Sequence, residues 1–204
     1  MLAMKDVQKD PQAERPLTQV SQFIQSGNLE GARALCEQVL AQSPQDAGAL
    51  LQLGLIAKSQ YRWADAIAVF ERALRIRVDP WMLGNLGNCY WKTGRIDEAE
   101  YCLRGAIELK PDFADAYVSL AMVLHGQHRF EDALIQIAAA EKLGAHDRKI
   151  ELRRGCTLTE LGRYDEAQQC FARSAQASGE FAYPRLVACD RASFDAITGT
   201  DRAA

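Results

Sequence analysis

The chain repeats itself about every 34 residues, and this period constrains the fold more than any other feature. Aligned on small side chains, it divides into the windows 13–46, 47–79, 80–113, 114–147 and 148–181. The second window is one residue shorter than the others, and the missing residue lies near Val78, Asp79 and Pro80. Position 20 of every window is alanine: Ala32, Ala66, Ala99, Ala133 and Ala167. We therefore expect five copies of one structural unit.

The pattern inside each window predicts two amphipathic helices, near positions 2–14 and 18–31. Position 8 is small in four windows, and positions 17 and 24 are mostly large and apolar. The residues at position 8 are Val20, Gly54, Gly87, Ala121 and Gly155, and those at position 24 are Cys36, Phe70, Leu103, Ile137 and Phe171. Small residues at positions 8 and 20 allow the two helices to approach closely, while large residues fill the space beside the contact. One unit cannot bury its apolar face alone, so we expect neighbouring units to stack.

The turns agree with this helical pattern. Gly27, Gly94 and Gly162 occupy position 15, where the first helix of a window must end, and glycine readily adopts the left-handed conformation there. In the fourth window His128 replaces this glycine. Pro44 and Pro111 follow the second helix of their windows. Pro16 suits the first turn of a helix, where we expect it.

Several of these segments resemble tetratricopeptide repeats. The segments that carry the resemblance are 86–90 (Leu-Gly-Asn-Cys-Tyr), 94–99 (Gly-Arg-Ile-Asp-Glu-Ala), 106–111 and 162–167 (Gly-Arg-Tyr-Asp-Glu-Ala). The resemblance implies an all-α fold, a right-handed superhelical solenoid of five helix-turn-helix repeats. It also implies a concave groove, lined by the first helix of each repeat, that receives an extended or helical peptide.

The two ends of the chain differ from the repeats. Residues 182–195 read as one more amphipathic helix, in which Leu186, Val187 and Cys189 could cover the last exposed face as a C-terminal cap. Residues 1–12 and 196–204 are polar and lack periodicity, so we expect both tails to be disordered.

Composition excludes several classes of partner and compartment. The formal net charge of −3 gives no reason to expect a nucleic-acid partner. No stretch is apolar enough for membrane insertion, and the N-terminus has no signal-peptide core, so we expect a cytoplasmic protein. The six cysteines include no C-x-x-C pair, which favours buried packing residues over a metal site.

We find no residues on which an enzyme could be built. The sequence lacks the phosphate-binding, dinucleotide-binding, nucleophile-elbow and zinc-protease motifs. His125 and His128 share one helix face, but no third metal ligand is near in sequence. We therefore expect no catalytic residues, no cofactor and no metal, and interpret the chain as a non-catalytic binding protein.

The resemblance places the peptide-binding residues mainly at positions 2, 5, 9, 12 and 13, and a dicarboxylate clamp found in some members also uses position 6. The candidates are Leu51, Leu55, Trp81, Asn85, Asn88, Trp91, Lys92, Val118, Met122, His125, Lys149, Leu152 and Arg153. Tryptophan is enriched among residues that dominate binding energy, so two tryptophans in this set favour an apolar client segment. The alternative is that both tryptophans only pack between repeats.

Two narrower identities stay open, as does self-association into a homo-oligomer. In the first, the chain binds acidic C-terminal tails through a dicarboxylate clamp, for which Asn88, Lys149 and Arg153 match but Gly84 and Ser119 do not. In the second, segment 80–94 resembles a repeat junction of type III secretion translocator chaperones. Those chaperones bind an extended hydrophobic segment, but they have three repeats rather than five.

Overall fold

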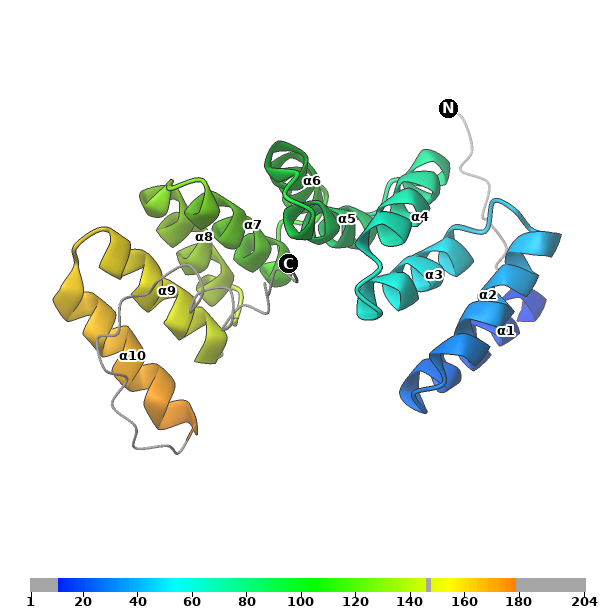
Figure 1. Ribbon diagram of the computed structural model, residues 1–204, viewed down its shortest axis with the longest axis horizontal. Coiled ribbons are helices and arrows are strands. Elements are labelled where there is room, and N and C mark those ends of the chain that lie inside the picture. Colours follow the sequence, from blue (N-terminus) through cyan, green and yellow to red (C-terminus); the bar gives the residue numbers. More distant parts are fainter. Residues whose placement is uncertain (1–10, 146–147, 179–204) are drawn as a thin grey trace, which may run out of the picture. The chain divides into compact units, whose positions relative to one another are not determined.

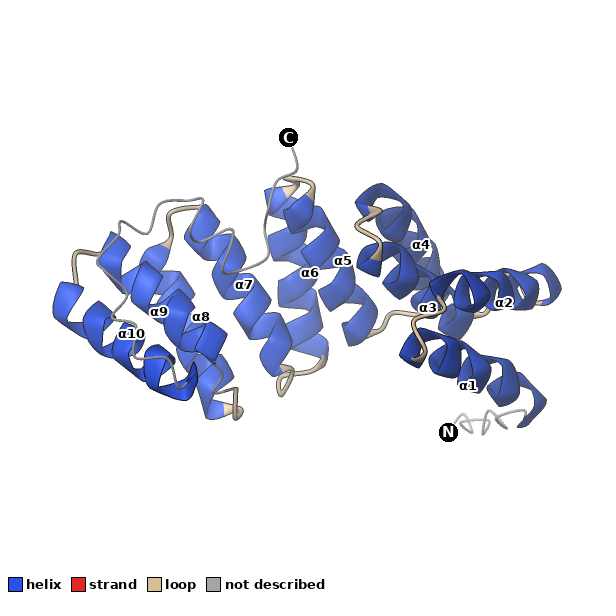
Figure 2. Cartoon of the chain, turned by 60° about the horizontal axis from the view of Figure 1, so that its bottom comes forward, coloured by secondary structure: helices blue, strands red, loops and turns tan. Residues whose placement is uncertain are grey.

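A computed structural model describes residues 11–145 and 148–178, and within these ranges all secondary structure is helical, joined by short turns (Figures 1 and 2). The ten helices of this part are α1 (Pro11–Gln25), α2 (Leu29–Gln42), α3 (Ala47–Ser59), α4 (Trp63–Ile76), α5 (Pro80–Lys92), α6 (Ile96–Leu109), α7 (Ala114–Gly126), α8 (Phe130–Lys142), α9 (Arg148–Glu160) and α10 (Tyr164–Ser178). The all-α prediction of paired helices is confirmed.

Each odd-numbered helix packs against the even-numbered helix that follows it. The alanines at position 20 are buried at these pair contacts. In the three windows with glycine at position 8, the large residue at position 24 lies directly on it. A Cβ built on Gly54 would be 2.5 Å from Cε1 of Phe70, and one on Gly87 would be 2.8 Å from Cγ of Leu103. The close approach predicted from the small residues is therefore present.

The turns within the helix pairs share one backbone conformation. Gly27, Gly94 and Gly162 have φ angles of 77°, 77° and 71°, as expected for the left-handed region. Tyr61 and His128 take the same place in the other two pairs, with φ angles of 59° and 61°. A side chain is strained in this region, so these two turns keep their shape at an energetic cost.

Four even-numbered helices begin with the same ion pair. The residue before the helix is an arginine whose guanidinium contacts a carboxylate in the first turn. The pairs are Arg62–Asp65, Arg95–Glu98, Arg129–Asp132 and Arg163–Glu166, with N–O distances of 2.6 to 2.9 Å. The carboxylates also lie favourably near the positive end of the helix dipole.

The chain divides into two compact units, residues 1–78 and residues 79–204. In the described part, α1 to α4 belong to the first unit and α5 to α10 to the second. The helix α1 begins at Pro11, so Pro16 is its sixth residue; the expectation that Pro16 lies in the first turn is wrong, because the helix gains a turn before it. The predicted cap at 182–195 and the tail at 196–204 lie outside the described residues, as does most of the tail at 1–12.

Candidate functional site

The predicted binding residues of the second unit lie on α5, α7 and α9. The central helix, α7, contacts both α5 and α9, so the three helices form one surface, which we call the odd-helix face (Figure 1). Trp81 and Lys149 are exposed there and Met122 is buried. The half-buried candidates are Asn85, Asn88, Trp91, Lys92, Val118, His125, Leu152 and Arg153. In the first unit, Leu51 and Leu55 are half-buried on α3.

Trp81 is the large apolar side chain that this face exposes most, at 49% of its surface. Its backbone is held at the start of α5, where the Asp79 carboxylate accepts hydrogen bonds from the N–H groups of Trp81 and Met82. Its ring lies 4.3 Å, centroid to centroid, from the buried Phe113, and the Lys110 ammonium lies 5.8 Å from the ring centroid. An indole held from several sides loses little entropy when a ligand contacts its free face.

Trp91, by contrast, takes part in packing between repeats. A Cβ built on Gly126, the last residue of α7, would lie only 2.2 Å from Cη2 of the Trp91 ring. The indole of α5 therefore lies directly against the end of α7. This contact supports the packing alternative for Trp91, and its role in binding stays a prediction.

His125 joins α7 to α9. Its Nδ1 lies 3.0 Å from the Thr157 hydroxyl oxygen, which in turn donates to the backbone carbonyl of Arg153 at 2.8 Å. With the Thr157 hydroxyl donating to that carbonyl, its oxygen is left to accept, which assigns the proton of the neutral His125 ring to Nδ1. Burial, with a smaller contribution from nearby His128, lowers the pKa of His125 from 6.5 to about 4. His125 is thus neutral at physiological pH and adds no charge to the odd-helix face.

The sequence did not indicate the residues that support Trp81. Phe113 and Lys110 lie in the connection between α6 and α7, outside the helix positions from which the binding residues were drawn. Gly126 and Thr157 were missed for a related reason: each acts through a neighbouring repeat, and the alignment of windows does not show which side chains meet across repeats.

The structure weakens the dicarboxylate-clamp alternative at Gly84. Gly84 stands where the clamp requires its first lysine, and it is buried. A Cβ at Gly84 would lie 3.1 Å from Cε1 of Phe113, so a longer side chain would displace that ring. Ser119, which replaces a clamp asparagine, is half-buried.

The part of the chain that the structure describes contains neither a metal site nor a membrane-spanning helix. No group of three His, Cys, Asp or Glu side chains is placed to hold a metal ion there. None of the described helices is both long and apolar enough to cross a bilayer.

Comparison with known families agrees with the helix pairs. Three family models, each described as a tetratricopeptide repeat, match residues 23–80, 85–148 and 152–180. The chain belongs to the tetratricopeptide repeat family. The resemblance seen in the sequence is thereby confirmed. Tetratricopeptide repeats are protein-interaction scaffolds that present extended binding surfaces, rather than a catalytic fold.

Individual proteins resemble this chain over short segments or at low sequence identity. The mitochondrial import receptor subunit TOM70 of Saccharomyces cerevisiae is 30% identical over 77 residues, which are 38% of this chain and 12% of the receptor. The chain thus matches only a small part of that receptor, and the activity of the whole receptor does not transfer with it.

Solved structures show the same fold. MamA from Desulfovibrio magneticus RS-1 is similar with a TM-score of 0.74 and 18% identity, over 83% of this chain and 97% of that chain. Another MamA structure has a TM-score of 0.71 and 20% identity, and the match covers 78% of this chain and 94% of that chain. YrrB is described as a tetratricopeptide repeat protein with an unusual peptide-binding site. Its structure has a TM-score of 0.68 and 20% identity, and the match covers 81% of this chain and 86% of that chain.

Proposed function

We propose that this tetratricopeptide repeat protein is a non-catalytic scaffold or adaptor that binds an apolar segment of a client protein on its odd-helix face. The observation that carries the proposal is Trp81, which is half-exposed and supported by Phe113 and Lys110. Exposed aromatic side chains in fixed positions are typical anchors of protein interfaces. Val118 and Leu152 add partly exposed aliphatic surface on α7 and α9.

An acidic tail is the second candidate, because Lys149 is exposed on α9 and Arg153 is one turn away. Against it stands the missing lysine at Gly84, since a lost charge-assisted contact costs about 1.5–3 kcal/mol. The resemblance to translocator chaperones gains little from the structure. The described part of the second unit has three helix pairs, which is their number of repeats, but segment 80–94 lies in the first of these pairs rather than at the second junction.

The test needs a client, which affinity purification from the native cell and mass spectrometry would supply. Affinity for the purified client is then measured by calorimetry for Trp81→Ala. We expect Trp81→Ala to weaken binding by about 2 kcal/mol. Because the Trp81 ring also covers part of Phe113, circular dichroism must first show that the variant is folded. Truncating Trp91 or Met122 is less informative, because Trp91 packs on Gly126 and Met122 is buried.

Tyr101→Ala is the matched control. Tyr101 is an aromatic residue of the same repeat that is 79% exposed, but it lies on α6. The proposal predicts an unchanged affinity for this variant and little effect of salt, since burial of apolar surface is not screened. Dominant losses from Lys149→Ala and Arg153→Ala, with binding that weakens as salt rises, would favour the acidic tail. Normal binding by Trp81→Ala together with a loss in Tyr101→Ala would refute the odd-helix face.

A further inference from the structure

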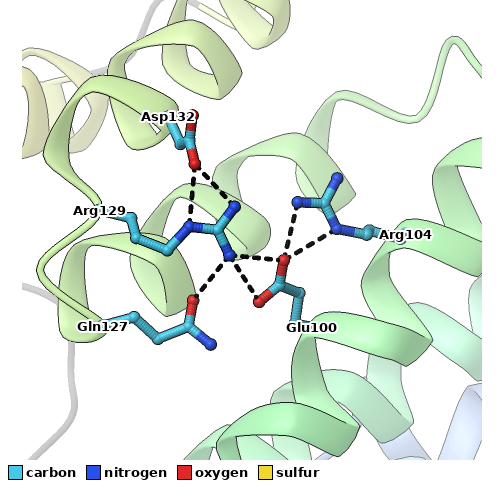
Figure 3. Close-up of polar contacts among 5 residues, drawn as sticks. All are labelled: Glu100, Arg104, Gln127, Arg129 and Asp132. Atoms are coloured by element: carbon cyan, nitrogen blue, oxygen red, sulfur yellow. Dashed lines mark hydrogen bonds and ion pairs between the residues drawn. The ribbon is translucent and has the colours of Figure 1, made fainter.

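The carboxylate of Glu100 connects the third repeat to the fourth. Glu100 lies on α6, and its side chain is only 17% exposed. It accepts hydrogen bonds from Arg104 on its own helix, at 2.7 and 2.9 Å, and from Nη1 of Arg129 in the turn between α7 and α8, at 3.0 and 3.1 Å. Figure 3 shows the Glu100 carboxylate lying between the two guanidinium groups.

Arg129 goes beyond the role that its position has in other repeats. Like Arg62, Arg95 and Arg163, it pairs with a carboxylate in the first turn of the following helix, here Asp132 at 2.7 Å. Unlike a purely local pair, its guanidinium also reaches the carboxylate of Glu100, twenty-nine residues earlier in the chain. The same guanidinium contacts the side-chain oxygen of Gln127 at 3.3 Å (Figure 3). The turn 127–129 is thereby fixed to α6.

This turn directly follows the residues of α7 that matter for the odd-helix face. Gly126, against which the Trp91 ring lies, precedes Gln127, and His125 precedes Gly126. The backbone N–H of Arg129 also donates to the carbonyl of Leu124 at 2.9 Å. Between them His128 has a φ of 61°, a conformation that a non-glycine residue keeps only when its surroundings hold it. Displacement of the turn would therefore move the end of α7.

We propose that Glu100 is a positioning residue: by holding Arg129, it fixes the C-terminal end of α7 and with it the places of Trp91 and His125. Its importance for client binding rests on the function proposed above. Its effect on Trp91 does not, and can be measured without a client.

The experiment uses Trp91 as a reporter in the full chain. The chain has three tryptophans, so Trp63→Phe and Trp81→Phe together leave Trp91 as the single tryptophan, which is excited selectively at wavelengths that tyrosine does not absorb. In this background we expect Glu100→Gln to raise the acrylamide quenching constant about twofold at a temperature well below melting, because the end of α7 opens locally more often. Glu98 lies on α6 like Glu100, but it pairs only locally, with Arg95 just before the helix. Glu98→Gln should therefore leave the quenching constant unchanged.

Two further variants separate positioning from general stability. Arg129→Gln should raise quenching as Glu100→Gln does, and the double variant should add nothing, because both remove one contact. Arg104→Gln should have no effect, since Arg104 contacts Glu100 from the same helix. If Glu100→Gln does not fold, Glu100→Asp shortens the side chain, keeps the charge and must give the same rise.

Unchanged quenching in Glu100→Gln or Glu100→Asp, or an equal rise in Glu98→Gln, would overturn the proposal. With a client in hand, affinity is measured in chains that keep Trp63 and Trp81, because Trp81 is the proposed anchor. Glu100→Gln that raises quenching in the reporter background but leaves this affinity unchanged would contradict the function of the odd-helix face and leave the positioning role intact.

Discussion

Trp91 and Gly126 come from neighbouring repeats, and their contact depends on the absence of a side chain at position 126. We expect Gly126→Ala to lower the free energy of unfolding by about 1–3 kcal/mol, because its Cβ would lie 2.2 Å from the Trp91 ring. In the background with Trp91 as the single tryptophan, its emission should also shift to longer wavelength as the ring moves into solvent. Urea unfolding and fluorescence spectra measure both effects.

Gly105→Ala is the control for this substitution, and its effect should have the opposite sign. Gly105 lies inside α6, where a Cβ would meet Cδ1 of Leu83 at an ordinary 3.6 Å. Alanine is favoured over glycine in a helix by about 1 kcal/mol, so this variant should be more stable. Equal effects of the two substitutions would show that helix propensity, and not the contact with Trp91, determines stability at position 126.

His125 makes stability depend on pH. Its pKa is about 4 in the folded chain and near 6.5 when unfolded, so the unfolded chain binds the proton more readily. The stabilisation is complete above pH 6.5 and is lost as the pH falls towards 4, by about 3 kcal/mol. His125→Asn can still donate to Thr157 but cannot be protonated, so its stability should change less in this range. Urea unfolding at several pH values tests this, and parallel pH profiles for both proteins would contradict it.

At the scale of the helices, the close contact within each pair follows from the alanines at position 20. Ala99 and Ala133 are fully buried between α5 and α6 and between α7 and α8. Replacing either with leucine should lower the melting temperature, because added volume in a packed contact costs about 1–3 kcal/mol. Ala68→Leu, at an exposed position of α4, should leave it nearly unchanged. Thermal unfolding followed by circular dichroism is the measurement, and full stability of both core variants would refute the alignment of the repeats.

The sequence predicts these helices well because the repeat supplies five examples of each contact within a pair. Glycine at position 8 and a bulky residue at position 24 recur, so the packing of Phe70 on Gly54 could be expected. The contact of Trp91 with Gly126 could not, because position 13 is glycine in one window alone. The left-handed turn at His128 could be anticipated from its place in the repeat, whereas the reach of Arg129 to Glu100 depends on three-dimensional spacing.

At the scale of the whole molecule, the chain separates into units after Val78, where one residue is missing from the repeat. The second unit exposes apolar side chains on its even-numbered helices as well as at Trp81. These are Tyr101 and Leu109 on α6, Ile135 on α8 and Tyr164 on α10. Exposure alone therefore does not single out the odd-helix face, and the proposal rests on the fixed position of Trp81.

Hydrogen exchange with mass spectrometry, with and without the purified client, tests the proposed face most directly. If the client binds the odd-helix face, backbone amides of α5, α7 and α9 should exchange more slowly in the complex, because binding suppresses their local opening. The even-numbered helices of the second unit should change less. Protection confined to α6, α8 and α10, or to the first unit, would contradict the assignment of the client to α5, α7 and α9.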